Sequence, residues 1–319
     1  MWKASKRHER RPSARSFIAL TGAFVVPKCA GERHTRPTCI ATRIPFAFRI
    51  VALILDLAHM STGITRIADG FWNLRGSFRI AGLVDIGTHI SLVRRGNGKF
   101  VFLDSYTLSE QQQQELEAIA GGAGKIEAIL NLHPFHTVHV RDMHARFPQA
   151  KLYGTARHHD KFPDLPWQKL RTEQPRLHAK YAADLEFSVP RGVDFVSADE
   201  NVHFSSVLAL HKASGTIHVD DTLMYIRLPL AARLLGKPDL LSFHPTLSRA
   251  LETRAGAAAE FRGWAEELIE RWSKAENLCA AHTATLTAAD NRGDSIKTRL
   301  RKALSKVAGT LRTHQRKYG

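Results

Sequence analysis

The sequence has no apolar run long enough to cross a membrane, although 44% of its 319 residues are hydrophobic. A membrane-spanning helix needs roughly 18 to 20 consecutive apolar residues. The best candidate, residues 50–58, follows Arg49 and is interrupted by Asp56. Cysteine is also scarce, and the odd count of 3 predicts no disulfide framework. These absences predict a cytoplasmic protein in a reducing compartment.

The body of the chain has no excess of either charge, although the whole protein has a formal net charge of +16. Residues 1–59 contain 11 Lys and Arg against 3 acidic residues, and residues 292–319 contain 9 against 1, so each end carries +8. Residues 60–291 hold 26 basic and 26 acidic residues. Because a nucleic-acid surface needs clustered positive charge, this balance argues against a nuclease. An RNA-associated role of the basic ends is a separate alternative.

The first 59 residues differ in composition from the rest of the chain. They are basic, and they contain an apolar run at 17–26 behind Arg10-Arg11. A basic stretch before such a run is typical of an export signal, but Pro12 directly after the arginines departs from that pattern. We therefore expect residues 1–59 to be an unstructured extension or an over-long start, with an export signal as the alternative.

Residues 292–319 carry a helical pattern. Apolar side chains recur every three or four positions from Ile296 to Leu311, and Lys and Arg fill the other face. This spacing predicts an amphipathic helix whose apolar face docks on its own domain, with a membrane surface or RNA as the alternative contact. Between the two basic ends, residues 60–291 form the predicted folded domain.

The body alternates between strand and helix patterns. Strands are predicted at 63–71, 87–94, 99–104, 125–132, 150–153, 193–197, 202–210, 215–219 and 278–281, and 87–104 is expected to form a hairpin. Helices are predicted at 109–120 with Ser109 as its cap, at 138–147 and at 255–274, and residues 157–190 form a proline-rich connection. A hairpin followed by alternating strands and helices predicts a mixed α/β layer fold with its helices outside.

Histidine is concentrated in the body, which holds 13 of the 17. His133, His136 and His139 stand three residues apart directly after a predicted strand, and Pro134 prevents a helix from running through the first of them. Such a junction can turn several imidazoles toward one point, and neutral imidazoles are the usual nitrogen ligands of Zn²⁺. The cluster therefore predicts a metal site, with a polar surface loop as the alternative.

Further side chains that can bind a metal stand at the ends of later predicted strands. His203 opens one strand, and Asp220 and Asp221 follow the next. His282 closes a third strand. Side chains at the carboxyl end of a strand face the loops, where ligands bind in open sheets. These strand ends predict a site that is assembled from several loops.

The order of these motifs resembles that of the metallo-β-lactamase-fold hydrolases. That family has an early histidine-rich loop, a later histidine at a strand, a Gly-Asp-Thr-Leu-like segment and a last histidine. The corresponding segments here are 132–139, 202–204, 220–223 and 281–283. The resemblance covers about residues 64–285, and it implies an αββα sandwich with one or two metal ions at the edge of the sheets.

The resemblance also implies the roles of single residues. The implied metal ligands are His133, His136, His139, His203, Asp221 and His282. Asp221 would bridge two ions or hold the nucleophile, and His282 would ligate or polarise, so these two are the expected catalytic residues. The implied cofactor is one or two Zn²⁺ ions, with iron or manganese as alternatives. Such an ion lowers the pKa of its water from about 15.7 toward 7, and the resulting hydroxide attacks a carbonyl or phosphorus centre.

The early motif departs from the family pattern His-x-His-x-Asp-His. With His139 as the last histidine of the pattern, Val138 stands at the aspartate position. His133 then reaches the first position only if the loop holds one extra residue. Asp220 stands where the family has glycine. These departures leave open a mononuclear site, a different metal or a site that has lost catalysis.

From the motifs and the resemblance we expect a metal-dependent hydrolase of a small ester, lactone, thioester or amide. The alternative is a catalytically degenerate protein of the same fold with a binding or structural role. The expected partner is a small-molecule substrate rather than a nucleic acid, and the sequence leaves the oligomeric state open.

Overall fold

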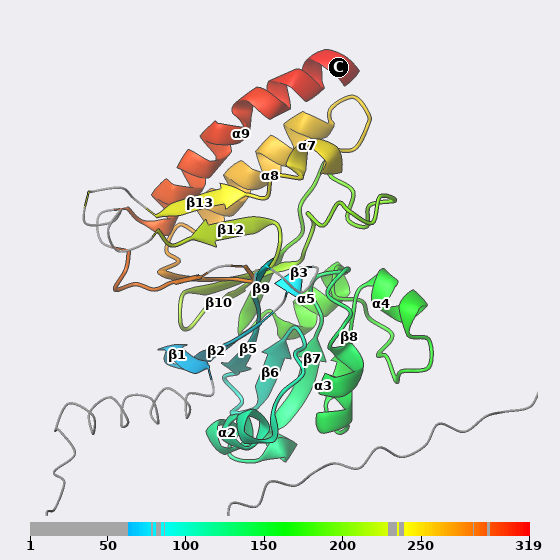
Figure 1. Ribbon diagram of the computed structural model, residues 1–319, viewed down its shortest axis with the longest axis vertical. Helices are drawn as coiled ribbons and strands as arrows, with labels where there is room; N and C mark the ends of the chain where they lie inside the picture. The colour runs from blue at the N-terminus through cyan, green and yellow to red at the C-terminus, as the bar shows by residue number, and fades with distance from the viewer. Residues whose placement is uncertain are drawn as a thin grey trace, which may run out of the picture. The chain divides into compact units, whose positions relative to one another are not determined.

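Two β-sheets lie at the centre of the fold in the computed structural model (Figure 1). The structure describes residues 63–77, 79–80, 84–85, 87–228, 235, 239–282, 284–291 and 294–319. The predicted extension at 1–59 therefore lies outside the described residues.

The first sheet has six strands in the order β1-β2-β5-β6-β7-β8. They are β1 (Ile64–Ala68), β2 (Phe71–Gly76), β5 (Thr88–Arg94), β6 (Phe100–Leu103), β7 (Ile126–Leu130) and β8 (Lys151–Tyr153). The predicted hairpin is confirmed, because β5 and β6 pair antiparallel. From β6 onward the strands run parallel to one another, so β6, β7 and β8 end at the same edge of the sheet. Two short strands, β3 (Arg79–Ile80) and β4 (Val84–Asp85), form a separate pair.

The second sheet has five strands in the order β15-β14-β11-β10-β9. They are β9 (Leu185–Ser188), β10 (Leu208–His211), β11 (Thr216–Val219), β14 (Asn277–Ala280) and β15 (Thr285–Leu286). β11 and β14 are parallel, and they too end at one common edge. β12 (Leu223–Ile226) and β13 (Leu240–Phe243) form an antiparallel pair that the sequence pattern did not predict.

The described residues form several helices, of which α2 and α9 each begin at a capping serine. They are α2 (Glu110–Ala120), α3 (Val140–Arg146), α4 (Ala156–Lys161), α5 (Pro175–Tyr181), α7 (Leu247–Ala250), α8 (Ala257–Arg271) and α9 (Ile296–Tyr318), with a 3-10 turn, η1 (Ala123–Lys125). Ser109 caps α2 as predicted: its Oγ accepts the N–H of Gln112, and the Gln112 side chain accepts the N–H of Ser109. Gly121 ends α2 at a φ of 77°, a left-handed conformation that suits glycine.

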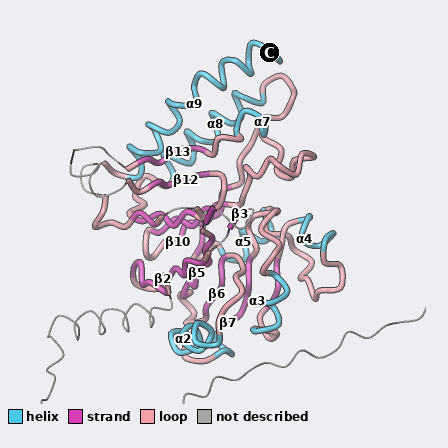
Figure 2. The backbone as a smooth tube through the Cα atoms, viewed as in Figure 1, coloured by secondary structure: helices cyan, strands magenta, loops and turns pink. Residues whose placement is uncertain are grey.

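Three buried hydrophobic clusters divide the fold into four layers. The cluster between the sheets takes Phe71 and Leu130 from the first sheet and Phe187 from the second. A second cluster joins the other face of the first sheet to α2 and α3, and a third joins the other face of the second sheet to α8 and α9. Figures 1 and 2 show these helices outside the strands. The order helix, sheet, sheet, helix is the αββα sandwich that we expected.

The helix α9 packs its apolar face against its own domain. Ile296, Leu300, Ala303 and Leu311 are buried in the cluster that also contains residues of α8 and β13. On the outer side, Arg301 and Lys297 form ion pairs with Glu270 of α8. Among the described residues, no helix has the length and hydrophobicity that crossing a membrane requires.

Several expected elements differ in the structure. Residues 157–190 contain most of α4, all of α5 and β9 rather than only a connection. The strand expected at 193–197 is not formed, because Val193 makes only an isolated bridge to Leu251. The strand expected at 202–210 begins only at Leu208, so His203 lies in the preceding loop. In these segments the apolar side chains pack into a hydrophobic cluster, but the backbone does not pair with another strand. An alternating apolar pattern predicts burial, and it does not tell a paired strand from an unpaired buried segment.

The helix after the histidine-rich loop is also shorter than expected. We expected this helix to cover residues 138–147, but α3 begins at Val140 and ends at Arg146. Met143 and Phe147 are buried, whereas the side chain of Val138 is 69% exposed. Val138 belongs to the loop, and its exposure becomes relevant to the pocket described below.

The docking of α9 predicts a measurable contribution to stability. Replacing the buried Leu300 by alanine removes methyl groups from a packed cluster, and we expect it to lower the free energy of unfolding by about 2 to 5 kcal/mol. Urea denaturation followed by circular dichroism measures this change. The exposed Lys306 on the same helix supplies the control, since Lys306→Ala should change the stability by less than about 0.5 kcal/mol. Equal small effects of both changes would show that α9 is not docked.

Candidate functional site

Four strand ends bring histidine and aspartate side chains together. Asp104 follows β6, and the loop with His133 follows its parallel neighbour β7. Asp220 and Asp221 follow β11, and His282 comes two residues after β14, its parallel neighbour. Because parallel strands end at a common edge, each pair of neighbouring strands delivers its side chains to the same place. The resulting cluster joins the two sheets.

The Asp221 carboxylate is the centre of this cluster. His282 Nε2 lies 2.7 Å from Asp221 Oδ1. His133 Nε2 and His136 Nε2 lie 3.2 and 3.7 Å from Asp221 Oδ2. Asp221 itself is 3% exposed, so these imidazoles are its main partners. Three of the predicted histidines thus surround the predicted aspartate, and their function as metal ligands stays a prediction.

The hydrogen bonds at Nδ1 decide what each ring presents to Asp221. His282 Nδ1 lies 2.9 Å from the carbonyl oxygen of Gly87, which can only accept, so Nδ1 carries a proton there. A neutral His282 therefore offers a bare Nε2 to an ion. His133 Nδ1 instead accepts the N–H of Phe135 at 3.0 Å. A neutral His133 carries its proton on Nε2, and it donates to Asp221.

Burial lowers the pKa of these imidazoles, whereas the neighbouring carboxylates raise it. Burial lowers the pKa of His136, but Asp220 and Asp221 outweigh it and raise this pKa well above its usual value. Burial likewise lowers the pKa of His282, and the hydrogen bond to Asp221 raises it overall. For His133 burial prevails, and its pKa is lowered. The carboxylates therefore favour the protonated forms of His136 and His282, and a cation bound at Asp221 would compete with these protons.

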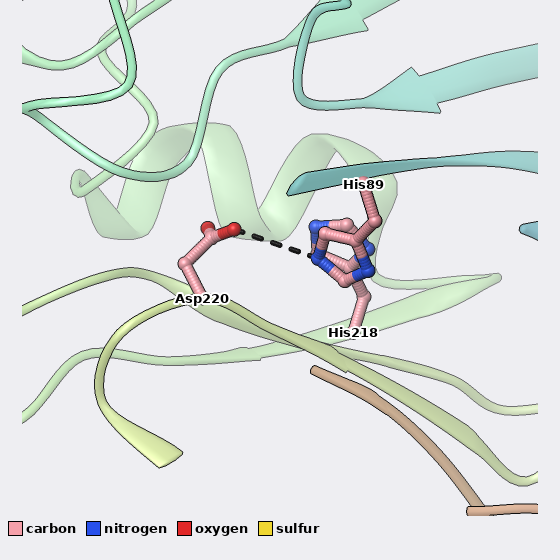
Figure 3. Close-up of side chains that lie close together, drawn as sticks. All are labelled: His89, His218 and Asp220. Carbon is pink, nitrogen blue, oxygen red and sulfur yellow. Dashed lines mark ion pairs between the residues drawn. The ribbon is translucent and has the colours of Figure 1, made fainter. Parts of the chain in front are cut away.

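A second cluster lies behind the first and is completely buried. It consists of His89 on β5, His218 on β11 and Asp220 (Figure 3), and Asp104 contacts it through His218. His218 Nε2 lies 2.8 Å from Asp104 Oδ2, and His89 Nε2 lies 3.5 Å from Asp220 Oδ1. Burial, with a contribution from Asp220, raises the pKa of Asp104 to about 6. The two clusters are connected, because His136 Nδ1 lies 3.4 Å from Asp220 Oδ1.

The structure does not place His139 and His203 around Asp221. His139 precedes α3, and its Nδ1 lies 2.9 Å from Thr107 Oγ1. His203 Nε2 donates to the carbonyl oxygen of Glu200 at 2.6 Å, and its ring stacks on Phe135. Both side chains line the pocket above the carboxylate rather than its immediate surroundings.

The positions of His133 and His136 change the register of the early motif. The family pattern His-x-His-x-Asp-His now corresponds to Asn131-x-His133-x-Phe135-His136, whereas we expected His139 to be its last residue. Asn131 is buried and bonded to Ser105 Oγ and to the backbone of Tyr153, so it does not face Asp221. Two positions of the pattern, Asn131 and Phe135, are therefore not occupied by metal ligands.

Asp104 and Arg75 contribute to the site, and we did not predict either. Asp104 directly follows a buried strand, the same signal that identified Asp220 and Asp221. Its Oδ1 accepts the N–H of Leu132, which fixes the start of the histidine-rich loop. Arg75 leaves no such signal in the sequence. It donates to the carbonyl oxygens just before His282, and only the packing of β2 against β14 brings it there.

A pocket of about 380 Å³ opens over Asp221, His136 and His282. Phe135 and Val138 form its apolar wall. Among the described residues that line the pocket there is neither lysine nor arginine, so its polar groups are hydroxyls, imidazoles, an amide and carboxylates. The buried carboxylate thus lies at the bottom of a cavity that a small molecule can enter.

The residues around Asp221 fit a metal ion. Imidazole nitrogens and a carboxylate are the donors that Zn²⁺ prefers, and bonds of about 2.0 to 2.1 Å place neighbouring ligand atoms roughly 3.3 Å apart. The distances of 3.2 and 3.7 Å from Asp221 Oδ2 to His133 and His136 are close to this value. Asp221 is 3% exposed, so its carboxylate needs protons or a cation as partners. Burying a carboxylate destabilises the folded state unless a proton or a cation pairs with it.

Arg75 is expected to stabilise the loop that carries His282. Its two guanidinium nitrogens donate to the carbonyl oxygens of Ala280 and Ala281 at 2.8 and 2.9 Å. Arg75→Met leaves both acceptors without this donor, and we expect a loss of about 1 to 3 kcal/mol in the free energy of unfolding, measured by urea denaturation. Arg66→Met, which removes only an exposed ion pair with Asp69, is the control and should change little. Equal effects of both variants would contradict this role.

The chain has matches among solved structures but not among protein-family models or curated proteins. Among solved structures it is similar to a metallo-beta-lactamase from Erythrobacter litoralis with beta mercaptoethanol in the active site, at 12% identity over 76% of this chain and 96% of that chain, with a TM-score of 0.49. A metallo-beta-lactamase from Hirschia baltica is 14% identical over 78% of this chain and 96% of that chain, with a TM-score of 0.47.

A metallo-beta-lactamase from Pseudomonas aeruginosa in its mono-zinc form is 13% identical over 79% of this chain and 95% of that chain, with a TM-score of 0.46. At these identities and TM-scores, the function has to be argued from the site itself. The four layers described above are the αββα sandwich that the resemblance in sequence implied, and the histidine and aspartate segments meet at the edge of the sheets, as that resemblance also implied.

Proposed function

We propose that this chain is a metal-dependent hydrolase of a small, uncharged ester, lactone, thioester or amide. The observation that carries the proposal is the Asp221 carboxylate, buried at the bottom of a pocket and approached by three imidazoles. A group of this composition is suited to holding a divalent cation beside a bound molecule. The layered fold is compatible with this activity but does not by itself establish it.

Asp221, His136 and His282 are the residues that would hold the ion. His282 is oriented for this by its bond to the carbonyl oxygen of Gly87, which leaves Nε2 directed at Asp221. His133 donates to Asp221 as the site stands, and it could ligate only after exchanging the bond from Phe135 N–H. When bound, such an ion lowers the pKa of a water toward 7 and polarises the oxygen of the bond to be cleaved.

The pocket favours an uncharged substrate. Phe135, Val138 and the ring of His203 supply an apolar wall, and Val138 is exposed as if for contact with another molecule. With neither lysine nor arginine among its described lining residues, the pocket offers no permanent cation to a phosphate or carboxylate. Glu200 at the rim would repel an anion, although Arg157 partly neutralises it. We therefore expect an acyl group of modest size to occupy this wall.

One specific observation favours the alternative, a protein that keeps the fold and binds a ligand without hydrolysing it. The early motif has lost ligands at Asn131 and Phe135, and Phe135 instead stacks on His203. A site with fewer ligands retains a metal more weakly, and loss of the aspartate removes a group that guides water. The two functions differ in turnover, which can be measured.

The metal centre predicts a loss of bound ion and activity when Asp221 is changed. Full-length protein purified without chelator should contain at least one equivalent of zinc, iron or manganese by elemental analysis. Asp221→Asn should lose this metal, and its kcat/KM on a panel of neutral 4-nitrophenyl esters and lactones should fall by about 100-fold or more, because an amide replaces the charge that balances the cation.

His144→Gln is the control, because His144 lies on α3 and is not one of the residues that line the pocket. It should retain metal and most of the activity. Absence of metal from the wild-type protein, folded and supplied with zinc, would refute the proposal. Metal that Asp221→Asn loses, without turnover of any substrate in the panel, would favour the binding protein.

A further inference from the structure

The buried group of His89, His218 and Asp220 resembles a second metal site. One ligand atom from each residue lies within 4.8 Å of the other two, and all three side chains are at most 1% exposed. Figure 3 shows the two rings one above the other, with Asp220 beside them. The directions of the hydrogen bonds show that this group has a different role.

His218 is not available to an ion. Its Nε2 lies 2.8 Å from Asp104 Oδ2, and its Nδ1 lies 2.9 Å from Ser91 Oγ. The rings of His218 and His89 are also stacked, with centroids 4.2 Å apart and planes at 11°. Imidazole lone pairs lie in the ring plane, so two nearly parallel rings cannot both direct a nitrogen at one ion.

The directions of its hydrogen bonds exclude His89 as a metal ligand. The Asn73 side-chain amide nitrogen lies 3.0 Å from the carbonyl oxygen of Ile90 and 3.2 Å from His89 Nδ1. The bond to a carbonyl fixes which end of the amide is the nitrogen. This nitrogen shares its two protons among Ile90 O, Ser91 Oγ at 3.0 Å and His89 Nδ1, and because it cannot accept, His89 Nδ1 can only be the acceptor in their contact. A neutral His89 then carries its proton on Nε2, the atom that lies 3.5 Å from Asp220 Oδ1. It presents an N–H to the carboxylate rather than a lone pair to a cation.

Asp220 is therefore an acceptor between two imidazoles. On one side is His89 Nε2, and on the other is His136 Nδ1 at 3.4 Å. Both distances are long for a strong hydrogen bond, and neither oxygen of Asp220 has a well-formed partner among the described residues. A buried carboxylate with such incomplete partners is stabilised when the ring of His136 is held in place and its Nδ1–H forms a closer hydrogen bond.

We propose that Asp220 is a positioning residue of the metal centre: it accepts the Nδ1–H of His136 and thereby directs His136 Nε2 at the ion on Asp221. His89, oriented by Asn73, holds the other side of the same carboxylate. The inference rests on the proposed function, since it concerns the same centre. A histidine that ligates a metal generally donates its other N–H to a carboxylate or carbonyl, and loss of that partner costs about 10- to 100-fold in metal affinity.

The location of Asp220 agrees with this role. It occupies the position at which the family motif has glycine, and the aspartate that the motif expects in the early loop is Phe135 here. Asp220 is 1% exposed, its carboxylate lies 3.4 Å from His136 Nδ1, and it is not among the residues that line the pocket, so it can hold the ring of His136 without contacting a substrate. Asp220 is buried, whereas Asp221 lies at the pocket.

Metal affinity tests the proposal independently of activity. Competition with a chromogenic chelator gives the dissociation constant of Co²⁺ and Zn²⁺ for full-length wild-type protein, Asp220→Asn and His89→Phe. We expect Asp220→Asn to bind the same number of ions with about 10- to 100-fold weaker affinity, and His89→Phe to shift affinity in the same direction. Asp184→Asn is the control, because it removes a structural carboxylate that binds Arg95 and lies outside the cluster. It should leave the affinity unchanged.

The tautomer of His136 supplies a test that needs no variant. In ¹⁵N-labelled, zinc-loaded wild-type protein, histidine ¹⁵N shifts should show His136 protonated at Nδ1 and metal-bound at Nε2. The opposite arrangement, or unchanged affinity in Asp220→Asn, would overturn the proposal while the hydrolase proposal stands. Loss of one of two ions in Asp220→Asn would make Asp220 a ligand and also overturn it. If wild-type protein binds no metal, both proposals fail.

Discussion

The burial of negative charge at the edge of two sheets is the constraint on which the rest of this structure depends. Asp104, Asp220 and Asp221 are each at most 3% exposed, and their carboxylates share one small region. Burying an ionised carboxylate costs several kcal/mol unless donors or cations surround it. The fold meets this requirement with imidazoles from β5, β7, β11 and β14, and it leaves one of the three carboxylates, Asp221, facing a pocket. The chemistry that we propose follows from that single opening.

The same constraint explains the arrangement of protons around the site. His218 donates to Asp104, and His89 directs its N–H toward Asp220, so these two histidines belong to the support of the centre. His136 lies between Asp220 and Asp221, and His282 is oriented by a backbone carbonyl. Imidazoles therefore approach both oxygens of one buried carboxylate, although Asn131 and Phe135 in the early loop do not face it.

Much of the fold could be predicted because local patterns carry it. The hairpin of β5 and β6, the capped α2 and the buried β7 follow from turn residues, a capping serine and a short apolar run. The pattern failed at 202–210 and 193–197, where apolar side chains enter a hydrophobic cluster without pairing. Buried loops and paired strands show the same alternation of apolar residues, so the sequence could not tell one from the other. It also missed β12 and β13, whose partner is set by packing against α9.

For the site, the sequence by itself determined the chemical types and their attachment points: histidines after β7 and aspartates after β11, with a last histidine after β14. Only the tertiary structure decided which of them meet. His133 and His136 face Asp221, whereas His139, three residues further on, bonds to Thr107, because the helix α3 begins there and turns the chain away. His89 and Arg75 reach the cluster from strands far away in the sequence. The sequence determines which side chains each loop carries, and only the packing of the sheets determines the direction in which each imidazole ring points.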